Sequence, residues 1–71
     1  MDTGKILKKI RLDKNTTQAE LAERVGSVQK SISQMESRSD IRLSTLMLIL
    51  KALDPRAKIL IRIPGKEDIE L

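Results

Sequence analysis

The chain contains no cysteine, no histidine and no aromatic residue. Without Cys and His, zinc, iron–sulfur, haem and disulfide chemistry lack their usual ligands, and the chain also lacks the commonest general base and the strongest nucleophile. Without Phe, Tyr and Trp, it has no platform on which the bases of a single-stranded nucleic acid could stack. We therefore expect no metal site, no cofactor and no enzymatic activity.

A chain of 71 residues has room for one domain only. Its apolar runs fall far short of the roughly 20 residues that cross a membrane, and residues 1–5 do not resemble a secretory signal. We therefore expect a cytoplasmic protein without a membrane partner. An aliphatic core in a domain below roughly 70–80 residues usually needs a disulfide, a metal or a partner subunit. Because the first two are excluded, we expect an oligomer.

Positive charge is concentrated in one part of the chain. The net charge is +4, and residues 1–56 carry all of it, with 11 basic and 7 acidic side chains. An excess of this size permits a nucleic-acid partner but is common among small soluble domains. The charge alone therefore does not decide the function.

Apolar residues recur with helical spacing near the start of the chain and again in its second half. A helix is predicted over residues 5–14, with its apolar side chains on one face. Asn15 suits its end, because Asn tolerates the left-handed conformation found there. Residues 43–53 are apolar nearly all round, which predicts a fourth helix at the centre of a core or an interface. Pro55 follows and prevents that helix from continuing.

Two short helices are predicted between these segments. The first begins at Thr17, because Thr17 and Glu20 have the spacing of a capping box, in which each side chain accepts from the other's backbone amide. Gly26 ends this helix, since glycine adopts a positive φ without strain. The second covers about residues 28–37, and the side chains expected on its apolar side are Val28, Ile32 and Met35.

Two short helices joined by a tight glycine turn form a helix-turn-helix, whose second helix can enter the major groove of DNA. The polar side of that helix then faces the bases. Gln bonds adenine at N6 and N7, Lys donates to guanine O6 and N7, and Ser suits either base. The alternative is a solvated helix face without a partner. The predicted base-reading residues are Gln29, Lys30, Ser33 and Gln34.

The end of the chain has the alternating pattern of a strand. Isoleucines alternate with mostly polar residues, which predicts a strand over residues 57–63, a Pro-Gly turn and a short return strand. A lone hairpin is marginal in water, and an unpaired apolar strand is a sticky edge. We therefore expect this strand to pair with its copy in a homodimer. The residues expected at the dimer interface are Ile59, Leu60, Ile61 and Ile63.

A family resemblance is carried by Thr17, Gln18, Leu21, Ala22, Gly26, Gln29, Ser31, Ile32, Ser33 and Glu36. With them, residues 5–54 resemble the Cro/C1-type helix-turn-helix family of phage repressors and small bacterial regulators. The resemblance implies a mainly α fold, a four-helix lambda-repressor-like DNA-binding bundle with a C-terminal β-strand or short hairpin. It implies a DNA-binding domain at residues 1–54 and a dimerisation element at residues 55–71.

The resemblance also implies a transcriptional regulator, most simply a repressor, that binds double-stranded DNA as a homodimer on a palindromic operator. Members of the family commonly pair an Arg of the first helix with a Glu that ends the third, which assigns an ion pair to Arg11 and Glu36. Glu36 lies at the edge of an apolar face, where a shielded charge is best tolerated when it is paired. Phosphate contacts are predicted from position: Gln18 lies at a helix start, whose amides suit an anion, and Arg38 and Arg42 flank the recognition helix. The alternatives are an ordinary capping turn and plain surface charge. The residues predicted to contact phosphates are Thr17, Gln18, Ser27, Ser31, Arg38 and Arg42.

Val28 and the C-terminal tail distinguish this chain from the phage repressors of the family. Val28 stands where the phage repressors usually have a Ser or Thr that caps the recognition helix. The tail is similar to that of antitoxin-like regulators encoded beside toxins, whose C-terminal strands commonly pair between subunits. This leaves an alternative function, an antitoxin that neutralises a partner toxin and regulates its own operon. A small toxin-like reading frame beside the gene would favour it.

Overall fold

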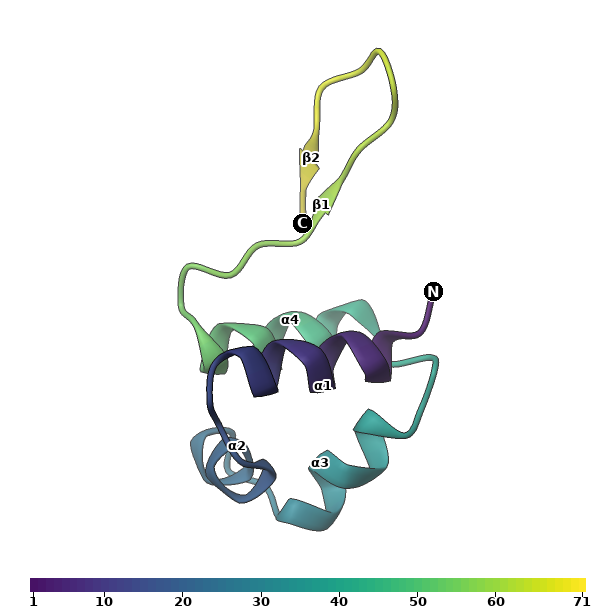
Figure 1. Ribbon diagram of the computed structural model, residues 1–71. Coiled ribbons are helices and arrows are strands. Elements are labelled where there is room, and N and C mark those ends of the chain that lie inside the picture. The colour runs from purple at the N-terminus through teal and green to yellow at the C-terminus, as the bar shows by residue number, and fades with distance from the viewer.

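The computed structural model describes residues 1–71, which form α1 (Thr3–Asp13), α2 (Gln18–Arg24), α3 (Gln29–Glu36), α4 (Leu43–Leu53), β1 (Leu60–Ile61) and β2 (Ile69–Glu70). Four helices followed by a small antiparallel hairpin confirm the mainly α architecture expected from the sequence. The α1 and α4 helices lie side by side, with α2 and α3 on one side of this pair (Figure 1). The hairpin projects from the opposite side (Figure 1). None of the α-helices combines the length and the apolar character that crossing a bilayer requires.

The helix ends follow local signals in the sequence. The α1 helix begins two residues earlier than expected, because Asp2 caps it by accepting a hydrogen bond from the Lys5 amide at 3.0 Å. The capping box of α2 is present, with both hydrogen bonds between Thr17 and Glu20 at 3.0 Å. Asn15 and Gly26 take positive φ values of 50° and 68°, as expected for the residues that end α1 and α2. Asp2 and Thr17 thus mark the starts of the first two helices, and Asn15 and Gly26 follow their ends.

The core fixes the helices relative to one another. All four helices contribute aliphatic side chains, and Ile41 joins them from the loop between α3 and α4. Each such side chain contributes about 1.5–3 kcal/mol when it is fully buried. The direction of α3 is therefore set by its packing and does not depend on a flexible turn. The buried side chains are Leu7, Leu21, Ala22, Ile32, Ile41, Leu46, Ile49, Leu50 and Leu53.

The link to the hairpin is anchored at Asp54. Its carboxylate accepts a hydrogen bond from the backbone amide of Arg56 at 2.9 Å and two more from the Arg56 guanidinium at 3.2 Å. Lys14, just after α1, donates to the same carboxylate at 3.1 Å. The bonds from Arg56, followed by that from Lys14, hold the pKa of Asp54 well below its usual range. The carboxylate thus ties the ends of α1 and α4 together where the chain leaves the helices.

The strand expected over residues 57–63 is much shorter in the structure. Only Leu60–Ile61 pairs with Ile69–Glu70, in the register Leu60 with Glu70 and Ile61 with Ile69. The alternating isoleucines give the strand one apolar face, and such a face is stable only when other side chains pack against it. Within a single chain, nothing packs against most of the hairpin. Leu60, Ile61 and Ile63 are accordingly about half exposed.

The position of Val28 also differs from the one predicted from the sequence. The helical spacing placed it on the apolar side with Ile32 and Met35, but its side chain is 62% exposed and α3 begins only at Gln29. Val28 precedes the helix with φ −118° and ψ 155°, which is extended backbone. Helical spacing therefore does not apply to it, and the extended conformation turns its side chain out to the surface.

Candidate nucleic-acid interface

The outer face of α3 carries the four predicted base-reading residues. The turn before it is held by a hydrogen bond from the Ser27 amide to the Ala22 carbonyl at 2.8 Å, and Ile32 is fully buried beneath the helix. With Ile32 inward, helical geometry places the polar residues on the other side. The structure brings these exposed side chains together on one face of α3: Gln29, Lys30, Ser33 and Gln34.

A buried ion pair holds the far end of α3. Arg11 donates from Nε to Glu36 Oε2 at 2.5 Å and from Nη2 to Glu36 Oε1 at 3.0 Å. The two side chains are only 7% and 4% exposed. A third bond runs from Arg11 Nη1 to the Thr16 carbonyl at 2.8 Å, and Gln18 Nε2 donates to Glu36 Oε1 at 3.1 Å. One network therefore joins α1, the start of α2 and the end of α3.

The charges in this network stabilise one another. Burial by itself raises the pKa of Glu36, but hydrogen bonds from Arg11 and Gln18, together with the positive charge of Arg11, outweigh it and lower the pKa. The hydrogen bond to Glu36 raises the pKa of Arg11. Both groups are therefore charged at neutral pH, and no buried polar side-chain atom of the protein is left without a partner.

A close backbone contact adds to this positioning. A Cβ atom on Gly4 would lie 2.0 Å from the carbonyl oxygen of Arg38 and 2.7 Å from those of Met35 and Glu36. The neighbouring Thr3 hydroxyl accepts a hydrogen bond from the Ile41 amide at 2.7 Å. Sequence reasoning missed this contact, because Gly4 lies outside the helix predicted over residues 5–14 and the oxygens that it approaches belong to residues far along the chain. The first turn of α1 thus supports the end of α3 and the loop that follows it.

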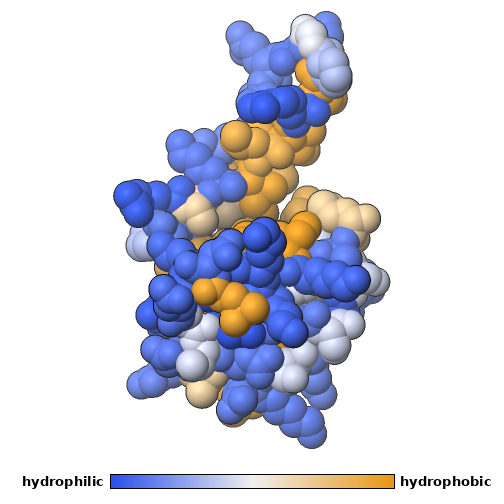
Figure 2. Space-filling model, viewed as in Figure 1, coloured by the Kyte–Doolittle hydropathy of each residue, from blue (hydrophilic) through white to orange (hydrophobic).

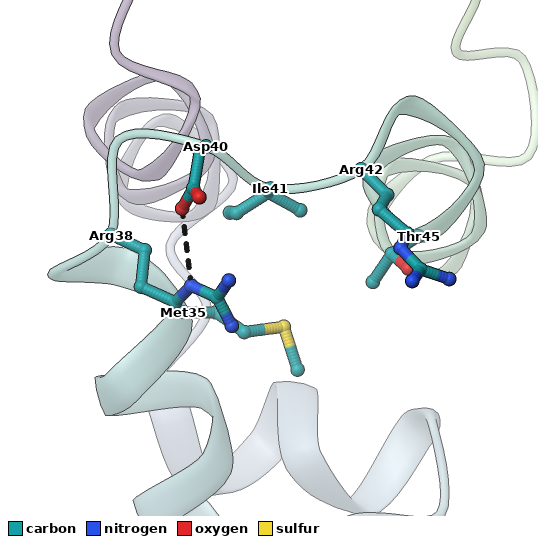
Figure 3. A pocket seen from close by; sticks show the side chains of 6 residues that line it. All are labelled: Met35, Arg38, Asp40, Ile41, Arg42 and Thr45. Atoms are coloured by element: carbon teal, nitrogen blue, oxygen red, sulfur yellow. Dashed lines mark hydrogen bonds and ion pairs between the residues drawn. The ribbon is translucent and has the colours of Figure 1, made fainter.

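Two of the predicted phosphate contacts lie together at that loop. Arg38 and Arg42 line one surface pocket, with Met35, Asp40, Ile41 and Thr45 (Figure 3). Arg38 lies in the loop just after α3, and Arg42 directly precedes α4. Arg38 Nε also forms an ion pair with Asp40 at 3.2 Å, which the sequence did not reveal. The pocket therefore offers two guanidinium groups and one competing carboxylate.

The other four phosphate candidates are placed differently. Gln18 is half-buried and uses one of its N–H groups on Glu36, so its side chain turns toward the protein interior. The Thr17 hydroxyl accepts the capping bond from the Glu20 amide, and Ser31 is half-buried on α3. Ser27 is exposed in the turn. They lie at the starts of α2 and α3, whereas the arginines lie beyond the other end of α3.

The predicted dimer residues lie on the far side of the molecule. Figure 2 shows apolar side chains gathered where the hairpin meets the helices, whereas the surface toward α2 and α3 is mostly polar. An apolar groove separates the base of the hairpin from α1 and α4. Ile59 is half-buried against the core, but Leu60, Ile61 and Ile63 are exposed. The groove is lined by residues that include Ile6, Ile10, Leu43, Leu50, Ile59 and Ile61.

A firmly packed bundle that presents a short polar helix beside basic side chains defines a DNA-binding helix-turn-helix domain. The helix-turn-helix family model matches residues 7–60, and the chain belongs to this family, of Cro/C1 type. No curated protein and no solved structure matched the chain. The match makes the protein a DNA-binding protein and not an enzyme. The structure contains no cluster of three acidic side chains that could hold a metal ion.

Proposed function

We propose that the protein is a transcriptional repressor that binds a palindromic operator as a homodimer in the cytoplasm. The observation that carries this proposal is the exposed polar face of α3, held at both ends by backbone and ion-pair contacts. Rigid placement matters because a bidentate contact to a base edge tolerates little error in position. The buried Arg11–Glu36 pair and the contact at Gly4 supply that rigidity.

Specificity and affinity come from different residues in this proposal. Gln29, Lys30, Ser33 and Gln34 read base edges in the major groove, whereas the residues at the helix starts and the two arginines contact phosphates. The phosphate contacts supply most of the salt-dependent affinity. Arg38 and Arg42 are the strongest candidates among them, because guanidinium groups bind phosphate in a bidentate manner and both line one pocket.

The test begins with selection of preferred DNA from a random pool at a stated salt concentration. Gln34→Ala is then expected to lose roughly 1–3 kcal/mol of binding to the selected duplex and little to random duplex. Arg42→Ala is expected to weaken both duplexes alike and to reduce the salt slope by about one unit. Leu48→Ala, at an exposed position on α4, is the control and leaves both unchanged. Equal loss on both duplexes for Gln34→Ala excludes base reading by this residue.

For the homodimer, we propose that residues 55–71 form the interface and that residues 1–54 form the DNA-binding part. The support is the exposed apolar hairpin, whose two short strands leave their outer edges unpaired, and the apolar groove beside it. Pairing with a second copy of the chain would cover the unpaired strand edges and the apolar groove. A two-fold axis on this side leaves the α3 helices free to enter successive major grooves, about 34 Å apart.

Sedimentation of point variants tests this interface. Ile61→Lys puts a charge on an exposed apolar side chain, so we expect it to separate the subunits while leaving each helical bundle folded. Leu48→Lys puts the same charge on an exposed apolar side chain of α4, outside residues 55–71, and is expected to remain dimeric. A chain cut after Asp54 should also lose dimerisation. A dimer that survives both Ile61→Lys and the truncation moves the interface to α1 or α4.

The exposed apolar hairpin also suits a second candidate function, an antitoxin that neutralises a partner toxin and regulates its own operon. The hairpin and α3 lie on opposite sides of α1 and α4 (Figure 1), so a toxin bound to the hairpin would leave α3 free. If the gene lies beside a small toxin-like reading frame, co-expression should relieve the toxicity of that protein and the two should co-purify. Unrelieved toxicity with no complex would exclude this role for that pair.

A further inference from the structure

Val28 is an unusual residue at the start of α3. It occupies the N-cap, where a side-chain oxygen normally accepts a hydrogen bond from the first turn, and it provides no such bond. Its side chain is 62% exposed and does not belong to the group of hydrophobic residues packed on the core. A valine here thus provides neither a helix cap nor core packing.

The position of this side chain is nevertheless well defined. The Val28 carbonyl accepts hydrogen bonds from the amides of Ser31 at 3.0 Å and Ile32 at 3.4 Å. Ile32 is fully buried, so the first turn of α3 is attached to the core. Valine is also stiff about its single χ1 angle. An exposed apolar group therefore stands at a fixed place directly before Gln29.

We propose that Val28 reads the 5-methyl group of a thymine in the major groove, beside the base that Gln29 contacts. This inference rests on the proposed function, in which the start of α3 enters the groove. The thymine methyl is the one apolar group that an unmodified base pair presents there. Valine cannot hydrogen-bond to a base edge, so it distinguishes thymine from cytosine by covering the methyl group.

The test uses the full-length protein and the DNA selected for it. Each thymine of one half-site is replaced in turn by uracil, which keeps every hydrogen-bonding group and lacks only the methyl. The wild type is expected to bind one of these duplexes about fourfold more weakly, the ratio that corresponds to one buried methyl group. Val28→Ala is expected to bind the thymine and uracil duplexes equally.

Two further variants separate recognition from folding. Val28→Ser restores a polar cap, so it is expected to raise the melting temperature while abolishing the preference for thymine. Leu48→Ala removes a side chain that is also 62% exposed, but on α4, and is expected to keep that preference. The inference is overturned if no uracil substitution weakens wild-type binding, if the selected half-site lacks thymine, or if Val28→Ala still prefers thymine. Absence of any preferred sequence would instead refute the proposed base reading itself, and this inference with it.

Discussion

Replacing Arg11 with methionine should destabilise the protein severely. Arg11→Met keeps most of the length of the side chain but removes both hydrogen bonds to Glu36 and the bond to the Thr16 carbonyl. Glu36 then remains as a charge that is 4% exposed, with Gln18 as its single side-chain partner. Removing one member of a buried pair typically costs 3–5 kcal/mol.

That loss is large for a chain of this size. A domain of 71 residues is expected to have a total stability of roughly 4–11 kcal/mol. A loss of about 3 kcal/mol lowers the melting temperature by at least about 12 °C in domains this small. Urea unfolding at pH 7, followed by far-ultraviolet circular dichroism, measures the change. Fluorescence cannot, because the chain has no aromatic residue.

A double variant and an exposed pair provide the controls. Arg11→Met combined with Glu36→Met leaves no unpaired charge, so it should be markedly more stable than the sum of the two single changes predicts. Lys9→Met breaks the exposed pair between Lys9 and Asp13, whose atoms lie 3.6 Å apart, and should cost less than about 1 kcal/mol. The reasoning is refuted if Arg11→Met costs no more than Lys9→Met and the changes at Arg11 and Glu36 are simply additive.

Three further predictions follow from neighbouring contacts. The pKa of Glu36 is lowered in the folded state, so its contribution to stability is complete above the unfolded pKa of about 4.3 and is lost as the pH falls through the lowered pKa. Glu36→Gln should therefore make the free energy of unfolding, measured by urea unfolding, depend less on pH in the acid range. Gly4→Ala places a methyl group 2.0 Å from the Arg38 carbonyl, so urea unfolding should reveal a loss of about 1–3 kcal/mol, whereas Lys5→Ala, at an exposed position, should be nearly neutral. Asp40→Asn frees Arg38, so binding titrations should give a severalfold tighter complex with selected and random DNA alike, and no such gain in the Arg38→Ala background.

Local sequence patterns predicted the four helices of this protein and the character of their surfaces. The capping box, the turn at Gly26 and the end of α1 at Asn15 depend on residues within a few positions of one another, so local chemistry suffices to predict them. The bounds of α4 at residues 43–53 follow from apolar residues that recur nearly all round the helix and from Pro55, which follows it. The polar face of α3 follows from the helical repeat, and the family resemblance points to the pairing of Arg11 with Glu36.

The contacts between these helices depend on packing in three dimensions, which no local pattern shows. The bond from Gln18 to Glu36 joins residues 18 positions apart, and the Thr3 hydroxyl meets an amide 38 positions away. The direction of Val28 and the short hairpin strands were also missed. A repeat pattern predicts side-chain directions only where the backbone is regular, and Val28 precedes the helix in extended backbone. It predicts a long strand only where another surface covers the apolar face, and a single chain provides no such surface for the hairpin. Periodicity shows which side chains share a face, but what each face meets depends on how the elements pack in space.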